Sequence, residues 1–178
     1  MKNKRQRAAN SSEELYEYAV RALARKMRTV AELKRLMRPR VPNGQELWIE
    51  AVVAKLKEHG YLNDTQYAVA FTRMRQENQR FGKRRVQQDL IAKGVHAEVI
   101  AKTLDVSYEG KDEAAMARQY LDRKRVAKPK DDKETARVMR MLMRAGYSSS
   151  AIWKALKAWK IEVPEEGSED IEEPSAST

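Results

Sequence analysis

The pattern of apolar residues along this 178-residue chain repeats three times at nearly even spacing. Four apolar positions recur in the same order in each copy: Leu33, Met37, Ile49 and Val53; Val86, Leu90, Ile100 and Leu104; Val138, Leu142, Ile152 and Leu156. The second and third copies have identical internal offsets, and each has a glycine, Gly94 or Gly146, four residues after its leucine. Units of such a repeat bury part of their apolar surface against their neighbours. The chain is therefore predicted to be an array of similar units.

Helical spacing and capping residues predict three helices in the first unit. An apolar face with helical periodicity follows Ser11 and Ser12, either of which is suited to an N-cap: Tyr16, Ala19, Val20 and Leu23. Thr29 and Glu32 form a capping-box pattern that opens a second helix, which should stop near Pro39. A third helix is expected over about 44–59, with Gly60 as its terminator.

The same order of helices is predicted twice more. Asp64 is expected to cap a helix whose apolar face is Tyr67, Ala70, Phe71 and Met74. Gly82 precedes a second helix that runs through Lys93, and a short helix is expected over 97–104. In the third unit helices are expected around 114–121, 132–144 and 149–159. No segment alternates with the period of a strand. The predicted fold class is all-α, with three tandem three-helix repeats forming an elongated, curved array.

Charge and hydropathy suggest boundaries for five segments. We assign residues 1–10 to a disordered basic arm, 11–62, 63–107 and 108–160 to helical repeats 1, 2 and 3, and 161–178 to an acidic disordered tail. Seven acidic residues and no lysine or arginine lie between positions 162 and 173. One hypothesis is that this tail competes with DNA for a basic face.

The net charge of +10 is unevenly distributed, because residues 1–160 carry all 36 lysines and arginines but only 19 of the 26 acidic residues. A strongly basic body suits a polyanion or an acidic protein surface. The alternative is a highly solvated helical surface. Cysteine is absent, which excludes disulfides and thiol chemistry and fits a cytoplasmic location. No stretch approaches the ~20 apolar residues that span a bilayer, so no membrane partner is expected.

The sequence offers little for catalysis or for holding a cofactor. His59 and His96 are the two histidines, they lie far apart, and no cysteine complements them, so no metal site is expected. Gly82-Lys83 lacks the glycine and hydroxyl spacing of a phosphate-binding loop. No nucleophile-elbow motif is present. We predict a protein that is not an enzyme and has no cofactor.

The densest group of cations flanks the turn at Phe81-Gly82 and is the candidate binding site. It comprises Arg73, Arg75, Arg80, Lys83, Arg84 and Arg85. We call this set the central basic cluster. Cations at a helix N-terminus oppose the helix dipole, so an external anion explains Lys83–Arg85 better than local stability does. The alternative is an ordinary solvated turn.

A second group of cations belongs to the third unit. It comprises Arg118, Arg123, Lys124, Arg125, Arg137, Arg140, Arg144, Lys154, Lys157 and Lys160. Trp153 and Trp159 lie beside it, where they would either stack on bases or, as we favour, pack within the unit.

The central stretch resembles the signature of the RecX family, bacterial regulatory proteins that modulate the recombinase RecA. The matching residues are Gly60-Tyr61-Leu62-Asn63-Asp64, Tyr67-Ala68, Phe71, Arg75, Phe81-Gly82-Lys83-Arg84-Arg85-Val86 and Leu90-x-x-Lys93-Gly94-Val95. The resemblance extends over about 15–158, because the flanking units fit the family's tandem three-helix layout. The insertion in the first unit, RPRVPN at 38–43, departs from the other two copies.

The resemblance implies a modular protein that lies in the groove of the RecA–DNA filament and bridges adjacent protomers. It would inhibit ATP turnover and strand exchange, and so affect recombinational DNA repair and the SOS response. The expected partners are the RecA filament and, as a further candidate, single- or double-stranded DNA, with the protein itself a monomer. One alternative is an autonomous nucleic-acid-binding helical repeat, and another is a scaffold for a different acidic protein.

Overall fold

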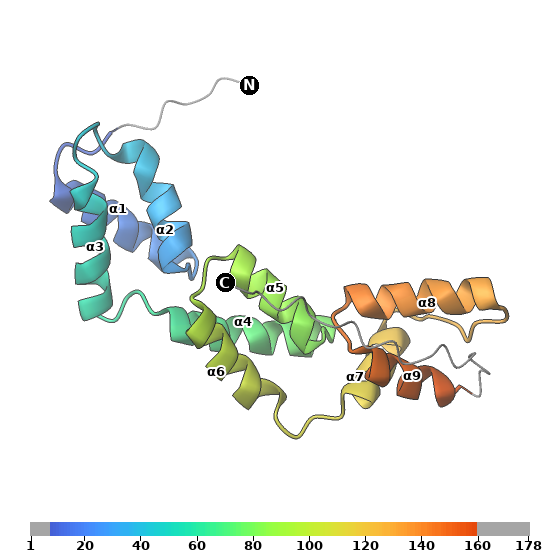
Figure 1. The fold of residues 1–178 in the computed structure, drawn as a ribbon. Coiled ribbons are helices and arrows are strands. Elements are labelled where there is room, and N and C mark those ends of the chain that lie inside the picture. Colours follow the sequence, from blue (N-terminus) through green and yellow to red (C-terminus); the bar gives the residue numbers. More distant parts are fainter. Residues whose placement is uncertain (1–7, 160–178) are drawn as a thin grey trace, which may run out of the picture.

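The computed structural model describes residues 8–159, and these form a curved row of helices (Figure 1). Within that range the secondary structure is nine α-helices and one short 3-10 helix, with no strand. The elements are α1 (Ser12–Arg25), α2 (Val30–Met37), η1 (Arg38–Arg40), α3 (Leu47–Glu58), α4 (Asp64–Gln79), α5 (Lys83–Ala92), α6 (Ala97–Tyr108), α7 (Glu113–Arg123), α8 (Asp132–Arg144) and α9 (Ser149–Lys157). None of these helices is long and apolar enough to cross a membrane.

The helices group in threes along the row, α1–α3, α4–α6 and α7–α9, as Figure 1 shows. Each group has its own cluster of buried apolar side chains. All twelve residues of the repeated apolar pattern are at least 95% buried. The predicted all-α, elongated and curved array of three-helix repeats is confirmed, because the repeated positions form three small cores in series.

Helix caps follow the sequence closely in the first unit. The Ser11 hydroxyl accepts from the Glu14 amide, and Thr29 and Glu32 form the complete capping box. The second helix ends before Pro39, which lies in η1. The third helix begins at Leu47, three residues later than predicted.

The predicted faces of two helices were partly wrong. In α1 the buried residues are Leu15, Ala19 and Ala22, and the predicted Tyr16, Val20 and Leu23 pack against the same core while partly exposed. The difference is larger in α4, where Ala70 and Met74 are exposed. There the helix turns Tyr67, Ala68, Thr72 and Gln76 inward, and the Gln76 side-chain amide donates to the Ser107 carbonyl at 3.0 Å. A hydrogen-bonded polar side chain is acceptable in this position, and hydropathy alone does not reveal it.

The start of α4 also differs from the prediction. Asn63 caps the helix, and its side chain accepts from the Gln66 amide. Asp64 instead accepts from the backbone amide of Val30, at 2.9 Å, across the boundary between the first two units. Its carboxylate thereby satisfies an amide at the N-terminus of α2, where an anion is favoured.

Residues 1–7 and 160–178, which hold most of the predicted arm and tail, lie outside the described residues. Within the segment assigned to the arm, Ala9 is buried in the core of the first unit. Its amide donates to the Arg40 carbonyl at 2.8 Å. The short insertion around η1 thus holds the chain entering α1.

Successive units meet through the second helix of each, in two contacts that we call the first and second joints. In the first joint the N-cap of α2, Thr29, donates its hydroxyl to the carbonyl of Lys93, the C-cap of α5, at 2.7 Å. In the second joint the N-cap of α5, Gly82, donates its amide to the carbonyl of Ala145, the C-cap of α8, at 2.9 Å. Each contact brings a helix C-terminus to the N-terminus of the preceding unit's helix, an arrangement of dipoles that is favourable.

The glycine after each of these helix ends makes the close approach feasible. A Cβ on Gly94 would overlap the Cβ of Ala31, and a Cβ on Gly146 would overlap the backbone of Arg85. Both glycines have positive φ, 75° and 90°, which favours glycine as well. The repeated glycines are therefore part of the contact between units, besides terminating helices.

Candidate interaction surface

The central basic cluster occupies the end of α4, the following turn and the start of α5. Arg80 caps α4 in the left-handed conformation, with a φ of 54°, and Gly82 caps α5. This turn brings the C-terminus of α4 beside the N-terminus of α5, so Arg75 and Arg85 meet at Asp89, whereas Arg73 lies with Val69 and Glu77 on another face of α4. The structure shows that the six cations differ in how much of their charge is already neutralised.

Asp89 binds two members of the cluster. It lies within 3.0 Å of Arg75 and 3.1 Å of Arg85, and its side chain is only 16% exposed. Arg75 and Arg85 also lie against the ring of Phe81. Because the carboxylate lies between two guanidinium groups, it offsets one of their two positive charges, and its bond to Arg75 joins α4 to α5.

Two further members form exposed ion pairs. Arg73 binds Glu77 one turn later at 2.7 Å, and the hydrogen bond and the charge of that carboxylate raise the pKa of Arg73. Lys83 binds Asp105 of α6 at 2.8 Å. Exposed pairs of this kind are weak and exchange readily with water or a competing anion.

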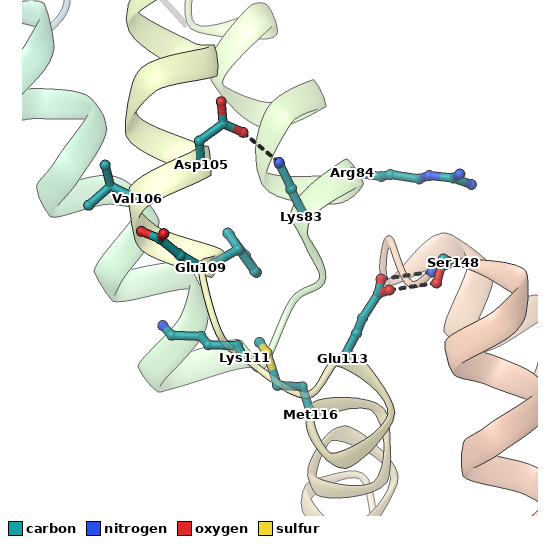
Figure 2. Close-up of a pocket in the computed structure, with 10 residues that line it drawn as sticks. Lys83, Arg84, Asp105, Val106, Glu109, Lys111, Glu113, Met116 and Ser148 are labelled. Carbon is teal, nitrogen blue, oxygen red and sulfur yellow. Dashed lines mark hydrogen bonds and ion pairs between the residues drawn. The ribbon is translucent and has the colours of Figure 1, made fainter.

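Arg84 and Arg80 form no ion pair with another described residue. Arg84 is exposed, and in Figure 2 its side chain extends away from the Lys83–Asp105 pair. Arg80 is half-buried, and its carbonyl accepts from the Tyr147 hydroxyl. Arg84 is consequently the member of the cluster most open to an external anion.

The turn within the cluster is also the second joint, a contact that was not predicted from the sequence. A Cβ on Gly82 would overlap the Gly146 carbonyl. The Tyr147 hydroxyl lies between two carbonyls, that of Arg80 and that of Met116 at 3.0 Å, and burial raises the pKa of this tyrosine. The recurrence of glycine four residues after Leu90 and Leu142 was the available signal for these contacts.

A cleft of about 510 Å³ opens beside this joint, between the second and third units (Figure 2). Its charged lining is balanced, with Lys83, Arg84 and Lys111 opposite Asp105, Glu109 and Glu113. Glu113 is engaged by the amide and hydroxyl of Ser148, at 2.8 and 2.5 Å. A balanced lining does not select a polyanion, so within the cleft the site best suited to nucleic acid is Arg84, which extends away from the Lys83–Asp105 pair.

The third unit has the larger excess of unneutralised cations. Residues 108–159 contain thirteen lysines and arginines against seven carboxylates. Every ion pair found among the described residues lies within residues 17–105, so none neutralises a cation of this unit. On α8, Arg137, Arg140 and Arg144 are exposed, while Val138 and Leu142 face the core. Trp159 packs on that core, as favoured from the sequence.

The described residues contain no group of three histidine, aspartate or glutamate side chains that is arranged to hold a metal ion. His59 pairs with the Tyr16 hydroxyl at 2.8 Å, at the end of α3. His96 begins α6 as its N-cap. Both histidines therefore have ordinary places at helix ends.

Comparison with known proteins identifies relatives over most of the chain. Residues 63–104 match the model of the second three-helix domain of RecX, and residues 111–156 match that of the third. The "Regulatory protein RecX" of Leptothrix cholodnii is 33% identical over 139 residues, which cover 78% of this chain and 85% of the relative. The protein of the same description from Thermus thermophilus is 35% identical over 152 residues, which cover 84% of this chain and 92% of the relative.

Solved structures show the same fold. A crystal structure of regulatory protein RecX superimposes with a TM-score of 0.70 at 20% identity, covering 83% of this chain and 71% of the other. The crystal structure of RecX from Lactobacillus salivarius gives a TM-score of 0.66 at 17% identity and covers 84% of this chain and 96% of the other. At these identities the structural likeness supports the architecture alone.

Proposed function

Because the chain belongs to the RecX family, we propose that it regulates the recombinase RecA by binding the RecA–DNA filament. Binding inhibits ATP hydrolysis and strand exchange, and thereby affects recombinational DNA repair and the SOS response. The protein acts as a monomer in the cytoplasm and uses no cofactor or metal.

The observation that best supports this proposal is the curved row of three-helix units with similar cores (Figure 1). A filament presents the same surface at regular intervals, and an array of similar units matches a repeating surface better than a single pocket does. The row carries exposed cations in its second and third units. Both the filament's DNA and acidic patches on its protein are suitable counterparts for them.

Titration of the protein into RecA ATPase and strand-exchange assays tests the proposal directly. We expect both activities to fall at amounts of protein below those of RecA, and the protein to bind filament more tightly than bare DNA. Unchanged activities at concentrations that saturate the filament would overturn the proposal.

All six residues of the central basic cluster are proposed as the surface that contacts the filament. Substitution of Arg84 gives the clearest test of this surface. Reversing Arg84 breaks no ion pair, whereas reversing Arg85 would also disrupt its bond to Asp89. We expect Arg84→Glu to weaken filament binding without changing helix content. The matched control is Lys102→Glu, an equal charge change at an exposed site on α6. Equal weakening by the two variants would mean that net charge alone matters.

Autonomous binding to nucleic acid is the second candidate, favoured by the unneutralised cations of the third unit. Binding dominated by phosphate contacts weakens steeply with salt, and each contact removed lowers the slope of log K against log salt by about 1. Reversal of Arg140 and Arg144 should then weaken binding to bare DNA and reduce this slope. If binding to bare DNA is tighter than binding to the filament, this second candidate replaces the first.

A further inference from the structure

The third unit carries an unused copy of the surface through which the units join. In each copy of the repeat, one position lies four residues before the first apolar residue of the pattern. It is occupied by Thr29, Gly82 and Glu134 in the first, second and third units. A second position lies one residue before that apolar residue, and it is occupied by Glu32, Arg85 and Arg137. The first two residues of each set lie in the two joints. Glu134 and Arg137 are their counterparts at the end of the row, where no fourth unit follows among the described residues.

A groove of about 350 Å³ lies at this place. Its apolar lining is formed by Val126, Ala127, Pro129, Val138 and Met141. Its charged lining consists of the cations Lys124, Arg125 and Arg137 with the single carboxylate Glu134. We call it the terminal groove. Arg125 has a φ of 51°, a conformation that glycine adopts at lower cost, so an arginine is present here despite the local backbone preference.

A further three-helix unit or a second copy of the chain does not suit the terminal groove. At both joints the equivalent residue is the N-cap of its helix and donates to the next unit, but Glu134 lies inside α8. Its amide is already bonded to the side chain of the actual cap, Asp131, at 2.7 Å. Gly94 and Gly146 are both used within the chain. The first unit has Val41 at the equivalent position, so it offers no third glycine.

The C-terminal segment of the chain itself suits the groove in charge, position and length. Figure 1 shows that α9 ends at the same extremity of the row at which α8 begins. Residues 165–173, EEGSEDIEE, follow within sixteen residues of Lys157 and carry six carboxylates and one large apolar residue, Ile171. At about 3.3 Å per residue sixteen residues reach up to ~50 Å, well beyond the ~20 Å length of a thirteen-residue helix such as α8.

We propose that residues 165–173 bind in the terminal groove of the same molecule. Their carboxylates contact Lys124, Arg125 and Arg137, and Ile171 covers the apolar floor. Bound in this way, the segment competes with any polyanion for the basic surface of the third unit. That consequence rests on the proposed function, whereas the contact itself does not.

Paramagnetic relaxation on the protein alone tests the contact. The chain has no cysteine, so Ser175→Cys gives a single attachment point for a nitroxide just after the segment. We expect the methyl signals of Val126 and Met141 to lose most of their intensity, and those of Val52 in the first unit to keep theirs. The full intensity of the groove signals would overturn the proposal.

Two further measurements identify the occupant. In a mixture of nitroxide-labelled protein without isotopes and isotope-labelled protein without nitroxide, the groove signals should stay intact, and their attenuation would mean that a second copy is the occupant. Arg137→Glu should restore the groove signals in the singly labelled protein. Lys154→Glu, an equal change on an exposed part of α9 outside the groove, should leave them attenuated. Equal responses of the two variants would reduce the contact to general charge attraction and overturn the proposal.

Removal of residues 162–178 tests the competition separately. If the segment occupies the groove about nine-tenths of the time, its removal lowers the apparent Kd for a short single-stranded DNA about tenfold. An unchanged Kd together with attenuated groove signals would overturn the competition and leave the contact standing. Neither result bears on whether the protein inhibits RecA, so the two proposals fail independently.

Discussion

The two joints share a backbone contact and differ in the side chains around it. In each, the end of one unit's second helix meets the N-cap of the preceding unit's second helix, with a glycine at the closest approach. The first joint adds polar contacts, the 2.7 Å ion pair between Lys93 and Glu32 and the bond from Val30 to Asp64. The second adds aromatic rings: Tyr120 and Tyr147 pack edge to face at a centroid distance of 6.1 Å, and Phe81 and Tyr120 are tilted at 6.3 Å.

The shared backbone contact places successive units in the same way, whereas the side chains around it differ and give each joint its own properties. The glycine and the cap-to-carbonyl bond set the approach of the helices, and both are common to the two joints. The side chains determine the response to solution conditions. An ion pair depends on salt and on pH, whereas buried rings depend on neither near neutrality. The first joint should therefore be the adjustable one and the second the more constant.

The largest effect is expected for Gly146→Ala in the second joint. The new Cβ would overlap Arg85, and the residue's φ of 90° is unfavourable for alanine. We expect the free energy of unfolding of the third unit to fall by about 3 kcal/mol or more, since strain and steric overlap add. Urea unfolding followed by tryptophan fluorescence measures this loss, because Trp153 and Trp159 are both in that unit.

Gly110→Ala is the matched control for this substitution. Gly110 also has positive φ, 66°, but nothing lies within 4 Å of the added Cβ. It should cost only the conformational part, about 1 kcal/mol. If the two variants lose equal stability, the close approach at the second joint contributes nothing.

Tyr147→Phe should have the next largest effect. It removes the hydroxyl shared by the Arg80 and Met116 carbonyls and leaves the ring packing intact. Because the two carbonyls lose a buried donor, we expect a loss of about 1–3 kcal/mol in the free energy of unfolding. Tyr61→Phe, at a side chain that is 59% exposed, should change it little. Comparable losses from both would argue against a special role for the buried hydroxyl.

Alkaline pH should loosen the second joint in the same way. Burial raises the pKa of Tyr108, whose hydroxyl donates to the Phe81 carbonyl, from 10.0 to about 12, and burial raises that of Tyr147 as well. The unfolded chain loses these protons first, so the contribution of Tyr108 to stability is complete below pH 10 and disappears as the pH rises from 10 to about 12. In a pH titration followed by tyrosinate absorbance, Tyr108 and Tyr147 should ionise at higher pH than the exposed tyrosines. Ionisation of both at the same pH as the exposed tyrosines would contradict the burial of their hydroxyls.

Much of the fold could be predicted because the repeat constrains it at several levels. The twelve repeated apolar residues are all buried, and the capping signals at Ser11 and Thr29 are where they were expected. The face of α4 could not be predicted from hydropathy, because Thr72 and Gln76 are buried there while Met74 is exposed. Such exchanges depend on partners from another helix, which periodicity does not show.

The surroundings of the central basic cluster were only partly predictable. The pairs Arg73–Glu77 and Arg85–Asp89 are spaced four residues apart on one helix, so they were readable from the sequence. The contacts of Arg75 with Asp89 and of Lys83 with Asp105 join different helices and required the fold. That cations gather at this turn was visible in the sequence, whereas the ion pairs that join α4 to α5 and α5 to α6 were not. Their role in binding stays a prediction.

The smallest expected effect belongs to the first joint, in the variant Glu32→Gln. Partial burial disfavours the charged form of Glu32, but the hydrogen bonds from Lys93 and the Thr29 amide outweigh it, so its pKa is lowered. Its stabilisation is therefore present above pH 4.5, the value in the unfolded chain, and is lost as the pH falls through the lower value of the folded state. We expect the variant to lose about 0.5–1 kcal/mol at neutral pH and low salt.

The loss of stability caused by Glu32→Gln should be smaller in high salt and below the native pKa of Glu32. Screening or protonation weakens the ion pair of the wild-type protein, so the substitution then removes less. Glu50→Gln is the control, because the Lys34–Glu50 pair has the same 2.7 Å length but lies within the first unit. Hydrogen exchange then distinguishes the two sites. Glu32→Gln should speed exchange at the amides on both sides of the first joint, and Glu50→Gln only within the first unit. Matching exchange patterns would show that the Lys93–Glu32 pair does not couple the units, and that the shared backbone contact alone holds the first joint.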